Sequence, residues 1–263
     1  MARRKNDIYL GLDISTTCIG ICLLEDDGSE HGKIIEITHI KPKVPRKTKA
    51  EEKIYLKKKA FQEYLKKYKG IGINHVVIEA PLLSSNNVNT VSTLLRFNGM
   101  ISDCVYTVLK VVPEYISSYD ARKYSFPELM SIRKYGKDEK QYDYDRIKSA
   151  IINAKFVLFG GYPWSIDKKT VIQGKVAEIF PNIEWLYDKK GELKKENFDG
   201  TDAYVSTLGS INKKRHGELE FKSKIIGESN DGKGTVEIKY EVEYWGKKEI
   251  RNTYIQIPKG ETI

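Results

Sequence analysis

The sequence has few of the residues that mark secreted, membrane or zinc-binding proteins. It contains three cysteines in 263 residues, and because they lie in apolar stretches we expect buried thiols in a reducing compartment rather than disulfides or zinc ligands. The four histidines are scattered without metal-ligand spacing. No apolar run approaches the roughly 18 residues of a membrane span, no signal-peptide pattern follows the basic first residues, and no internal repeat is present. These absences predict a soluble, cytoplasmic protein with no membrane partner.

Positive charge is concentrated in one part of the chain. The formal net charge is +9, and residues 41–70 alone hold twelve Lys and Arg against three Glu. Such a basic segment attracts phosphates regardless of base sequence, which favours a nucleic-acid partner. A solvated, lysine-rich helix face explains the same charge equally well, so both interpretations stay open. If the segment binds DNA, its contacts are predicted at Lys57, Lys58 and Lys59.

The spacing of apolar residues predicts an α/β fold. Three strands, a helix, a strand, a helix and a strand follow one another, which indicates a mixed sheet with antiparallel and parallel pairs. Gly99, within the second helix, is expected to allow close packing. The expected elements are strands over 7–13, 19–24 and 33–41, a helix over 51–69, a strand over 75–79, a helix over 90–110 and a strand over 111–117.

Two later segments depart from this alternation of strands and helices. Residues 127–166 are charged and aromatic, contain a helix expected over 142–158, and are interpreted as an insertion. Residues 213–263 alternate apolar and polar side chains, which predicts a three-stranded antiparallel meander whose apolar face needs cover from the chain itself, a second subunit or DNA. The predicted organisation is a domain over 1–212 and a C-terminal β extension over 213–263. Between the two segments, helices are expected over 168–180 and from 199 to about 211.

Four acidic residues stand where carboxylates are least expected. Asp13 and Glu79 end apolar strands, and Asp199 and Asp202 lie three residues apart at the expected start of a helix. Strand ends can meet at one edge of a sheet, and acids three residues apart project on one side of a helix. Such negative charge requires cations, and hard oxygen ligands suit Mg²⁺ or Mn²⁺. The sequence therefore predicts a site for two ions that would activate water and stabilise the leaving oxygen of a phosphodiester.

Each acid also has a purely structural interpretation. Asp13 could cap a turn, Glu79 could form a salt bridge at a strand end, and Asp199 could be a helix N-cap. The joint placement favours the metal site, because Asp202 within an otherwise apolar helix needs a partner if it is buried.

The residues around these acids resemble RuvC-type Holliday junction resolvases, which have the RNase H-like fold. The resemblance covers about residues 7–126 and 167–212, and its motifs are Leu-Gly-Leu-Asp13, Val-Ile-Glu79 and Asp199-x-x-Asp202-Ala. It implies an RNase H-like mixed sheet flanked by helices, with the four acids as catalytic ligands of two Mg²⁺ ions that Mn²⁺ can replace. It also implies a homodimer that nicks four-way DNA junctions at two symmetric strands. The insertion and the β extension lie outside the compact family pattern and are typical of larger phage or viral members, which act in the host cytoplasm.

Further DNA contacts follow from the same resemblance. Lys168 resembles a basic residue of the family near the scissile phosphate and is predicted to be catalytic, with Lys169 beside it in contact with DNA. Leu82 lies where family members carry an aromatic wedge. Ser125 stands at the position of a family lysine, for which Arg122 or Lys123 would substitute.

Three other functions stay open. The same acids would serve another RNase H-like nuclease acting on branched DNA or on an RNA:DNA hybrid. The run Leu-Gly-Leu-Asp-Ile-Ser-Thr-Thr also resembles the first phosphate loop of the actin, hexokinase and sugar-kinase superfamily, with ATP as ligand, but those proteins usually need two such halves and a glycine-rich adenosine motif. A non-enzymatic DNA-structure-binding protein that retains the fold is the third alternative.

Overall fold

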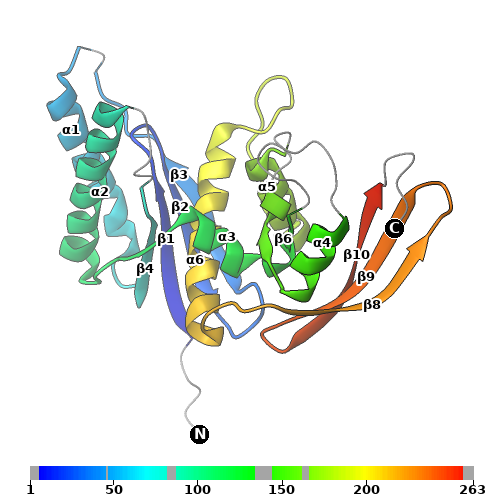
Figure 1. The fold of residues 1–263 in the computed structure, drawn as a ribbon. Coiled ribbons are helices and arrows are strands. Elements are labelled where there is room, and N and C mark those ends of the chain that lie inside the picture. The colour runs from blue at the N-terminus through cyan, green and yellow to red at the C-terminus, as the bar shows by residue number, and fades with distance from the viewer. Residues whose placement is uncertain (1–5, 46, 82–86, 134–143, 162–165, 257–263) are drawn as a thin grey trace, which may run out of the picture. The chain divides into compact units, whose positions relative to one another are not determined.

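The computed structural model describes residues 6–45, 47–81, 87–133, 144–161 and 166–256, and the chain divides into two compact units (Figure 1). Unit 1 comprises Met1–Ala121 and Asp167–Asn212, and unit 2 comprises Arg122–Ile166 and Lys213–Ile263. No helix in the described ranges is long and apolar enough to cross a membrane. The strands are β1 (Asp7–Ile14), β2 (Ile19–Asp26), β3 (Lys33–Ile40), β4 (His75–Glu79), β5 (Glu114–Ile116), β6 (Met130–Ile132), β7 (Phe156–Leu158), β8 (Lys222–Asn230), β9 (Thr235–Tyr244) and β10 (Lys247–Gln256). The α-helices are α1 (Ala50–Leu65), α2 (Val88–Leu109), α3 (Ser118–Ser125), α4 (Tyr144–Ile152), α5 (Lys168–Ile179) and α6 (Lys195–His216).

Unit 1 is built on a five-stranded mixed sheet. Its strand order is β3-β2-β1-β4-β5. Strands β1, β2 and β3 pair antiparallel, whereas β4 pairs parallel with both β1 and β5. A parallel pair needs a long crossover, and α1 and α2 supply the crossovers into β4 and β5. The predicted mixed α/β sheet flanked by helices is confirmed.

The two faces of this sheet are covered by different helices (Figure 1). Side chains alternate between faces along a strand, and Leu10 and Leu12 of β1 pack with Phe61 of α1 and Phe97 of α2. The residues of opposite parity, Gly11 and Asp13, therefore face the other side, where α6 lies. Helix α6 is buried along most of its length in unit 1, so it forms the second layer over the sheet.

Two glycines allow α6 to lie directly on the strands. A Cβ atom added at Gly11 would stand 1.9 Å from the Thr207 hydroxyl and 2.3 Å from the Ala203 carbonyl oxygen, both on α6. At Gly20 of β2, an added Cβ would stand 2.0 Å from the Asp199 carbonyl oxygen. Contacts this short do not occur between real atoms, so the helix depends on the absence of side chains at both positions.

Unit 2 has a separate core. Strands β8, β9 and β10 form an antiparallel sheet in the order β10-β9-β8, which confirms the predicted meander. The alternating apolar residues of β9, including Val236 and Ile238, pack with Ile147 and Ile151 of α4 and with Phe156 of β7. Described residues from both sequence segments of unit 2 thus contribute to one hydrophobic core, and the chain itself covers the apolar face of the meander.

Three local expectations are wrong. The helix expected over 142–158 ends at Ile152, because Ala154 has a φ of 49° that a helix cannot contain, and the next apolar residues form β7, which pairs with β6. Helix α6 begins at Lys195, four residues before Asp199, because the buried Asn197 amide exchanges hydrogen bonds with the Leu186 backbone and anchors an earlier turn. Gly99 mediates no close packing, since an added Cβ would meet nothing within 4 Å.

We expect the substitution Gly20→Ala to destabilise the protein by about 1–3 kcal/mol or more, because an added methyl group would push α6 away from β2. The measurement is the free energy of unfolding from denaturant titration. Gly99→Ala is the matched control: it removes a helical glycine at an exposed, open position, so it should stabilise the protein by roughly 0.5–1 kcal/mol. Equal effects of the two changes would contradict the close contact at Gly20.

Candidate metal centre

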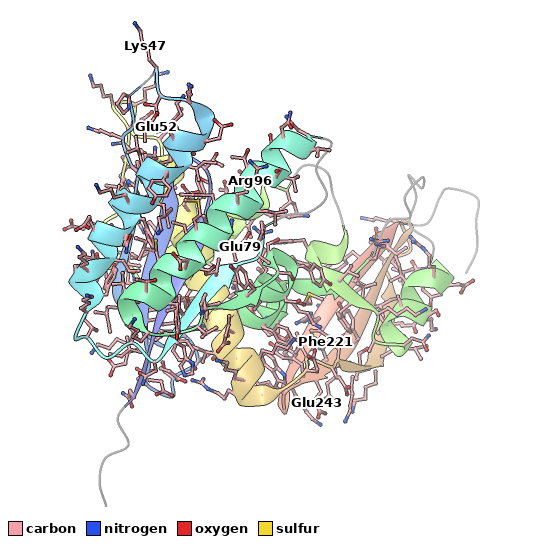
Figure 2. All side chains as sticks on the ribbon, turned by 90° about the vertical axis from the view of Figure 1, so that its left-hand side faces the viewer. Lys47, Glu52, Glu79, Arg96, Phe221 and Glu243 are labelled. Atoms are coloured by element: carbon pink, nitrogen blue, oxygen red, sulfur yellow. The ribbon has the colours of Figure 1, made fainter. Side chains whose placement is uncertain are left out.

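Asp13 and Glu79 lie at the same end of two adjacent strands. Strands β1 and β4 are parallel, and Leu12 pairs with Ile78. The next residue of each strand is an acid, so the two carboxylates stand side by side in register at one edge of the sheet. Figure 2 labels Glu79 at the end of β4. In β4, Val76 and Ile78 belong to the hydrophobic core that packs against α1 and α2. Glu79 has the opposite parity, so it lies on the other side of the sheet with Asp13, the side that α6 covers.

Helix α6 brings the second pair of acids to the same place. The Asp199 carbonyl packs against Gly20, which is the register partner of Asp13 in β2. Asp199 lies in the second turn of α6 and not at its N-cap, so the capping interpretation of this residue is wrong. Asp202 lies three residues further along the helix, and its exposed fraction is 4%.

The electrostatics of Asp13 link this residue to the other three acids. Burial raises the pKa of the Asp13 carboxyl well above its ordinary value, and the nearby carboxylates of Glu79, Asp202 and Asp199 raise it further. The ammonium group of Lys169 acts in the opposite direction and lowers it. Residues that lie 66 to 189 positions from Asp13 in the sequence therefore act on its carboxyl group.

Lys169 makes a direct ion pair within this site. Its Nζ lies 2.7 Å from Oδ2 of Asp202, whose side chain is 5% exposed, against 48% for Lys169. Burial disfavours the charged ammonium, but the carboxylates of Asp202, Asp13 and Asp199 outweigh it and raise the pKa of Lys169. A buried carboxylate without such a partner would be strongly destabilising, so Lys169 supplies the counter-charge for Asp202.

Several neighbours fix the positions of these groups. The buried Cys18 thiol hydrogen-bonds to Asp199, and burial followed by this bond raises the pKa of Cys18. Lys41 forms an ion pair with Glu196 in the first turn of α6. Lys57 donates to the carbonyl oxygen of Thr16, in the loop that follows Asp13. Sequence reasoning had assigned no positioning role to these contacts.

The donors fit a hard divalent cation in chemistry. Carboxylate oxygens are the ligands that Mg²⁺ and Mn²⁺ prefer, and the mutual repulsion felt by Asp13 is the kind that a cation relieves. Within the described ranges, however, no group of three or more His, Cys, Asp or Glu side chains is already arranged to hold an ion. The acids lie within electrostatic reach of one another, and one of them is held by Lys169.

The other predicted DNA contacts are distributed over both units. In unit 1, Lys58 lies 3.3 Å from an Asp103 carboxylate oxygen, and Lys59 is exposed. In unit 2, Lys123 lies over the Tyr124 ring, 5.1 Å from its centroid, and Arg122 is half-buried. Leu82 lies outside the described residues.

The two adjacent lysines at the start of α5 differ in position. Asp167 caps the helix, Lys168 is its first residue, and Lys169 is the one bonded to Asp202. The sequence spacing does not separate the two lysines: Lys169 precedes the buried residues Ile172 and Val176 by three and seven positions, Lys168 precedes them by four and eight, and both spacings are typical of one helix face. The sequence predicts the catalytic role for Lys168, and the ion pair of Lys169 with Asp202 is visible only in the packed structure.

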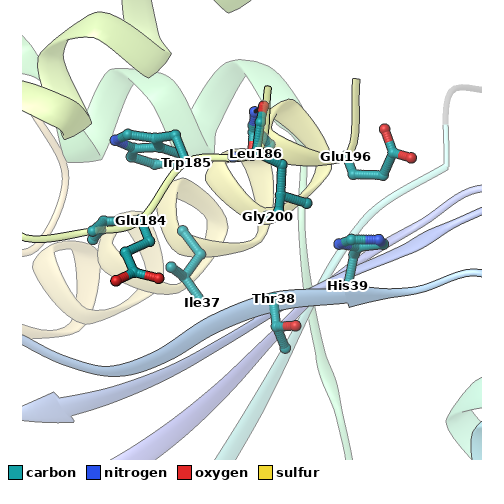
Figure 3. A pocket seen from close by; sticks show the side chains of 10 residues that line it. Ile37, Thr38, His39, Glu184, Trp185, Leu186, Glu196 and Gly200 are labelled. Carbon is teal, nitrogen blue, oxygen red and sulfur yellow. Dashed lines mark hydrogen bonds between the residues drawn. The ribbon is translucent and has the colours of Figure 1, made fainter. Parts of the chain in front are cut away.

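A small hollow lies beside the first turns of α6 (Figure 3). It has a volume of about 190 Å³ and is lined by residues that include His39, Trp185, Glu196 and Gly200, and by none of the four acids. Its volume is below the roughly 300–1,000 Å³ of common small-molecule sites. This hollow therefore gives no support to a nucleotide-binding interpretation.

The raised pKa of Asp13 leads to a prediction about stability. A carboxyl with a raised pKa binds more protons in the folded than in the unfolded state. The folded state therefore loses stability as the pH rises above about 4, the ordinary pKa of an aspartate. In metal-free buffer near pH 8, Asp13→Asn should therefore raise the melting temperature by a few degrees, at roughly 2–4 °C per kcal/mol. The difference in melting temperature between Asp13→Asn and the wild type should shrink as the pH falls toward about 4. Exposed Glu220→Gln is the control and should leave the melting temperature unchanged; a lower melting temperature for Asp13→Asn at pH 8 would contradict the assignment.

Comparison with known proteins finds similarity in structure alone: no protein-family model and no curated protein matches this sequence. RuvC of Thermus thermophilus, in complex with a Holliday junction substrate, aligns at 11% identity over 80% of this chain and 96% of that chain, with a TM-score of 0.47. The yeast mitochondrial Holliday junction resolvase Ydc2 aligns at 8% identity over 80% and 82%, with a TM-score of 0.45. An inorganic polyphosphate/ATP-glucomannokinase from Arthrobacter aligns at 20% identity over 46% and 48%, with a TM-score of 0.30. All three TM-scores lie below 0.5 and the identities below 25%, so these similarities carry no argument about the activity of this chain.

Proposed function

We propose that this chain is a Mg²⁺-dependent endodeoxyribonuclease that resolves four-way DNA junctions. The observation that carries the proposal is the convergence on Asp13 of three further carboxylates, Glu79, Asp199 and Asp202, each of which raises its pKa. Purely structural acids are spread out to avoid such repulsion, whereas perturbed acids clustered at one site are typical of functional centres. The motifs that carry these acids resemble those of the resolvases.

The four acids that would hold the metal lie on two kinds of secondary structure. Asp13 and Glu79 are fixed on hydrogen-bonded strands, and Asp199 and Asp202 on a helix that touches those strands without intervening side chains. Two Mg²⁺ ions, or Mn²⁺ in their place, supply a nucleophilic water and neutralise charge on the phosphodiester. The strands and the helix hold the backbones of these donors in place, while the side chains of Asp13, Glu79 and Asp199 remain partly exposed. Lys168, the half-buried first residue of α5, is proposed to contact the DNA phosphates.

The basic segment before and along α1 is the proposed DNA surface of unit 1. Lys53 and Lys59 belong to α1, and Lys47, labelled in Figure 2, precedes it. Lys57 and Lys58 bond to Thr16 and Asp103, so we assign them to positioning and place the phosphate contacts at Lys53 and Lys59.

A homodimer follows from the proposed reaction. One chain carries one set of the four acids, and resolution of a junction requires two nicks in symmetric strands. A second copy of the chain would supply the second set, since a two-fold junction is matched by a two-fold protein.

Cleavage of labelled DNA tests the proposal. With Mg²⁺, the wild-type chain should cut a four-way junction into nicked duplexes faster than it cuts a flap, a plain duplex or an RNA:DNA hybrid. Asp13→Asn should bind the junction but cut it about 10³-fold more slowly or worse, because loss of one carboxylate that would hold the metal removes several kcal/mol of transition-state stabilisation.

Other outcomes would point elsewhere. Undiminished cutting by Asp13→Asn would contradict the assigned site. Faster cutting of flaps or hybrids would favour another RNase H-like nuclease, and junction binding without cutting by the wild type would favour a DNA-structure-binding protein. ATP hydrolysis without nuclease activity would favour the kinase-like alternative.

The basic surface is tested separately by the salt dependence of junction affinity. The double change Lys53→Gln and Lys59→Gln should weaken binding and reduce the slope of log affinity against log salt by about 0.9 for each phosphate that is no longer neutralised. Lys66→Gln is the control, because Lys66 already pairs with Glu63 at 2.7 Å. Unchanged affinity in the double variant would return α1 to the interpretation of a solvated helix face.

A further inference from the structure

The ion pair between Lys169 and Asp202 places a fixed cation inside the acid cluster. Asp167 caps α5 through its side chain, which fixes the first turn, from which the half-exposed Lys169 side chain reaches Asp202. The Nζ atom lies 2.7 Å from Oδ2 of Asp202. Since the Asp202 side chain is only 5% exposed, little water reaches this carboxylate to take the place of the ammonium group.

Lys169 acts on the whole cluster and not on Asp202 alone. The charge interactions of its ammonium group extend to Asp202, Asp13 and Asp199. Its positive charge opposes the three carboxylates that act on Asp13. The metal-free site is therefore partly neutralised from within.

A divalent cation and this ammonium group compete for the same carboxylate. A cation bound to Asp202 would stand within a few ångströms of Nζ, where like charges in a partly buried site repel more strongly than in bulk water. With Lys169 on Asp202, one of the four carboxylates already has a cation on it. An ion that binds Asp202 at the same oxygen would require the ammonium group to move.

We propose that Lys169 is an internal counter-ion that occupies Asp202 in the metal-free protein and leaves that carboxylate when a divalent cation binds. Lys169 is a long side chain that is about half exposed, so it can swing toward solvent without unfolding α5. Its released ammonium group then lies next to the metal-bearing carboxylates, where a substrate phosphate would come to rest. Metal loading would thus precede the delivery of this cation to the substrate. The inference rests on the metal-binding part of the proposed function.

Metal affinity without DNA tests this inference. Mn²⁺ and Mg²⁺ titrations, followed by calorimetry and by the melting temperature, compare the wild type with Lys169→Gln. Removal of the competing cation should tighten metal binding at least about fivefold, the low end of usual coupling between two ligands. It should also lower the melting temperature in EDTA, because the buried Asp202 carboxylate is deprived of its ammonium counter-charge, and added metal should restore it.

Three variants separate direct competition from a general change in charge. Lys168→Gln removes one positive charge from the neighbouring position and should change metal affinity less than about twofold, while Lys169→Arg keeps the ion pair and should resemble the wild type. In an Asp202→Asn background, Lys169→Gln should no longer tighten binding, because its target carboxylate is gone.

Two results would overturn the inference: equal tightening by Lys168→Gln and Lys169→Gln, or a crystal structure with Mn²⁺ bound in which Nζ remains at ion-pair distance from Asp202. Failure of the wild type to cut DNA would contradict the proposed nuclease but leave these metal affinities interpretable. Failure of the wild type to bind Mn²⁺ or Mg²⁺ would overturn both.

Discussion

The arrangement of unit 1 depends on the contact between the backbone of α6 and strands β1 and β2. Interior packing leaves no room for even one extra methyl group at such a contact, and both Gly11 and Gly20 lie under the helix with no space for a Cβ. A larger residue at either position would lift α6 and carry Asp199 and Asp202 away from the strand ends. The spacing of the candidate site is therefore set by two residues that have no side chain.

The same contact creates the electrostatic problem of the site. Parallel pairing of β1 and β4 sets Asp13 beside Glu79, and α6 closes over them with two more carboxylates. Burial weakens screening by water, so repulsion between these groups is stronger than at the surface. Lys169 relieves part of it through Asp202. Functional sites commonly retain such unfavourable charge because it is offset when a ligand binds.

Unit 2 obeys a simpler rule. A three-stranded meander has one apolar face that must be buried, and in this chain the cover comes from α4 and β7, far earlier in the sequence. Ring contacts strengthen the packing: Phe156 lies against Phe221, with centroids 4.8 Å apart. Alternation along β9 predicted the strand but not its partner, because any apolar layer of suitable size would satisfy the same pattern.

The sequence by itself determined the strands of unit 1, their mixed pairing and the identity of the four acids, because apolar periodicity and strand-end carboxylates are local properties of the chain. The register of Asp13 beside Glu79, the approach of α6 over Gly20 and the choice of Lys169 over Lys168 were decided only by tertiary structure. Each of these depends on contacts between residues distant in sequence, and a one-residue shift on a helix changes which side chain reaches a given partner. Local pattern therefore identified the charged groups, and packing determined which of them meet.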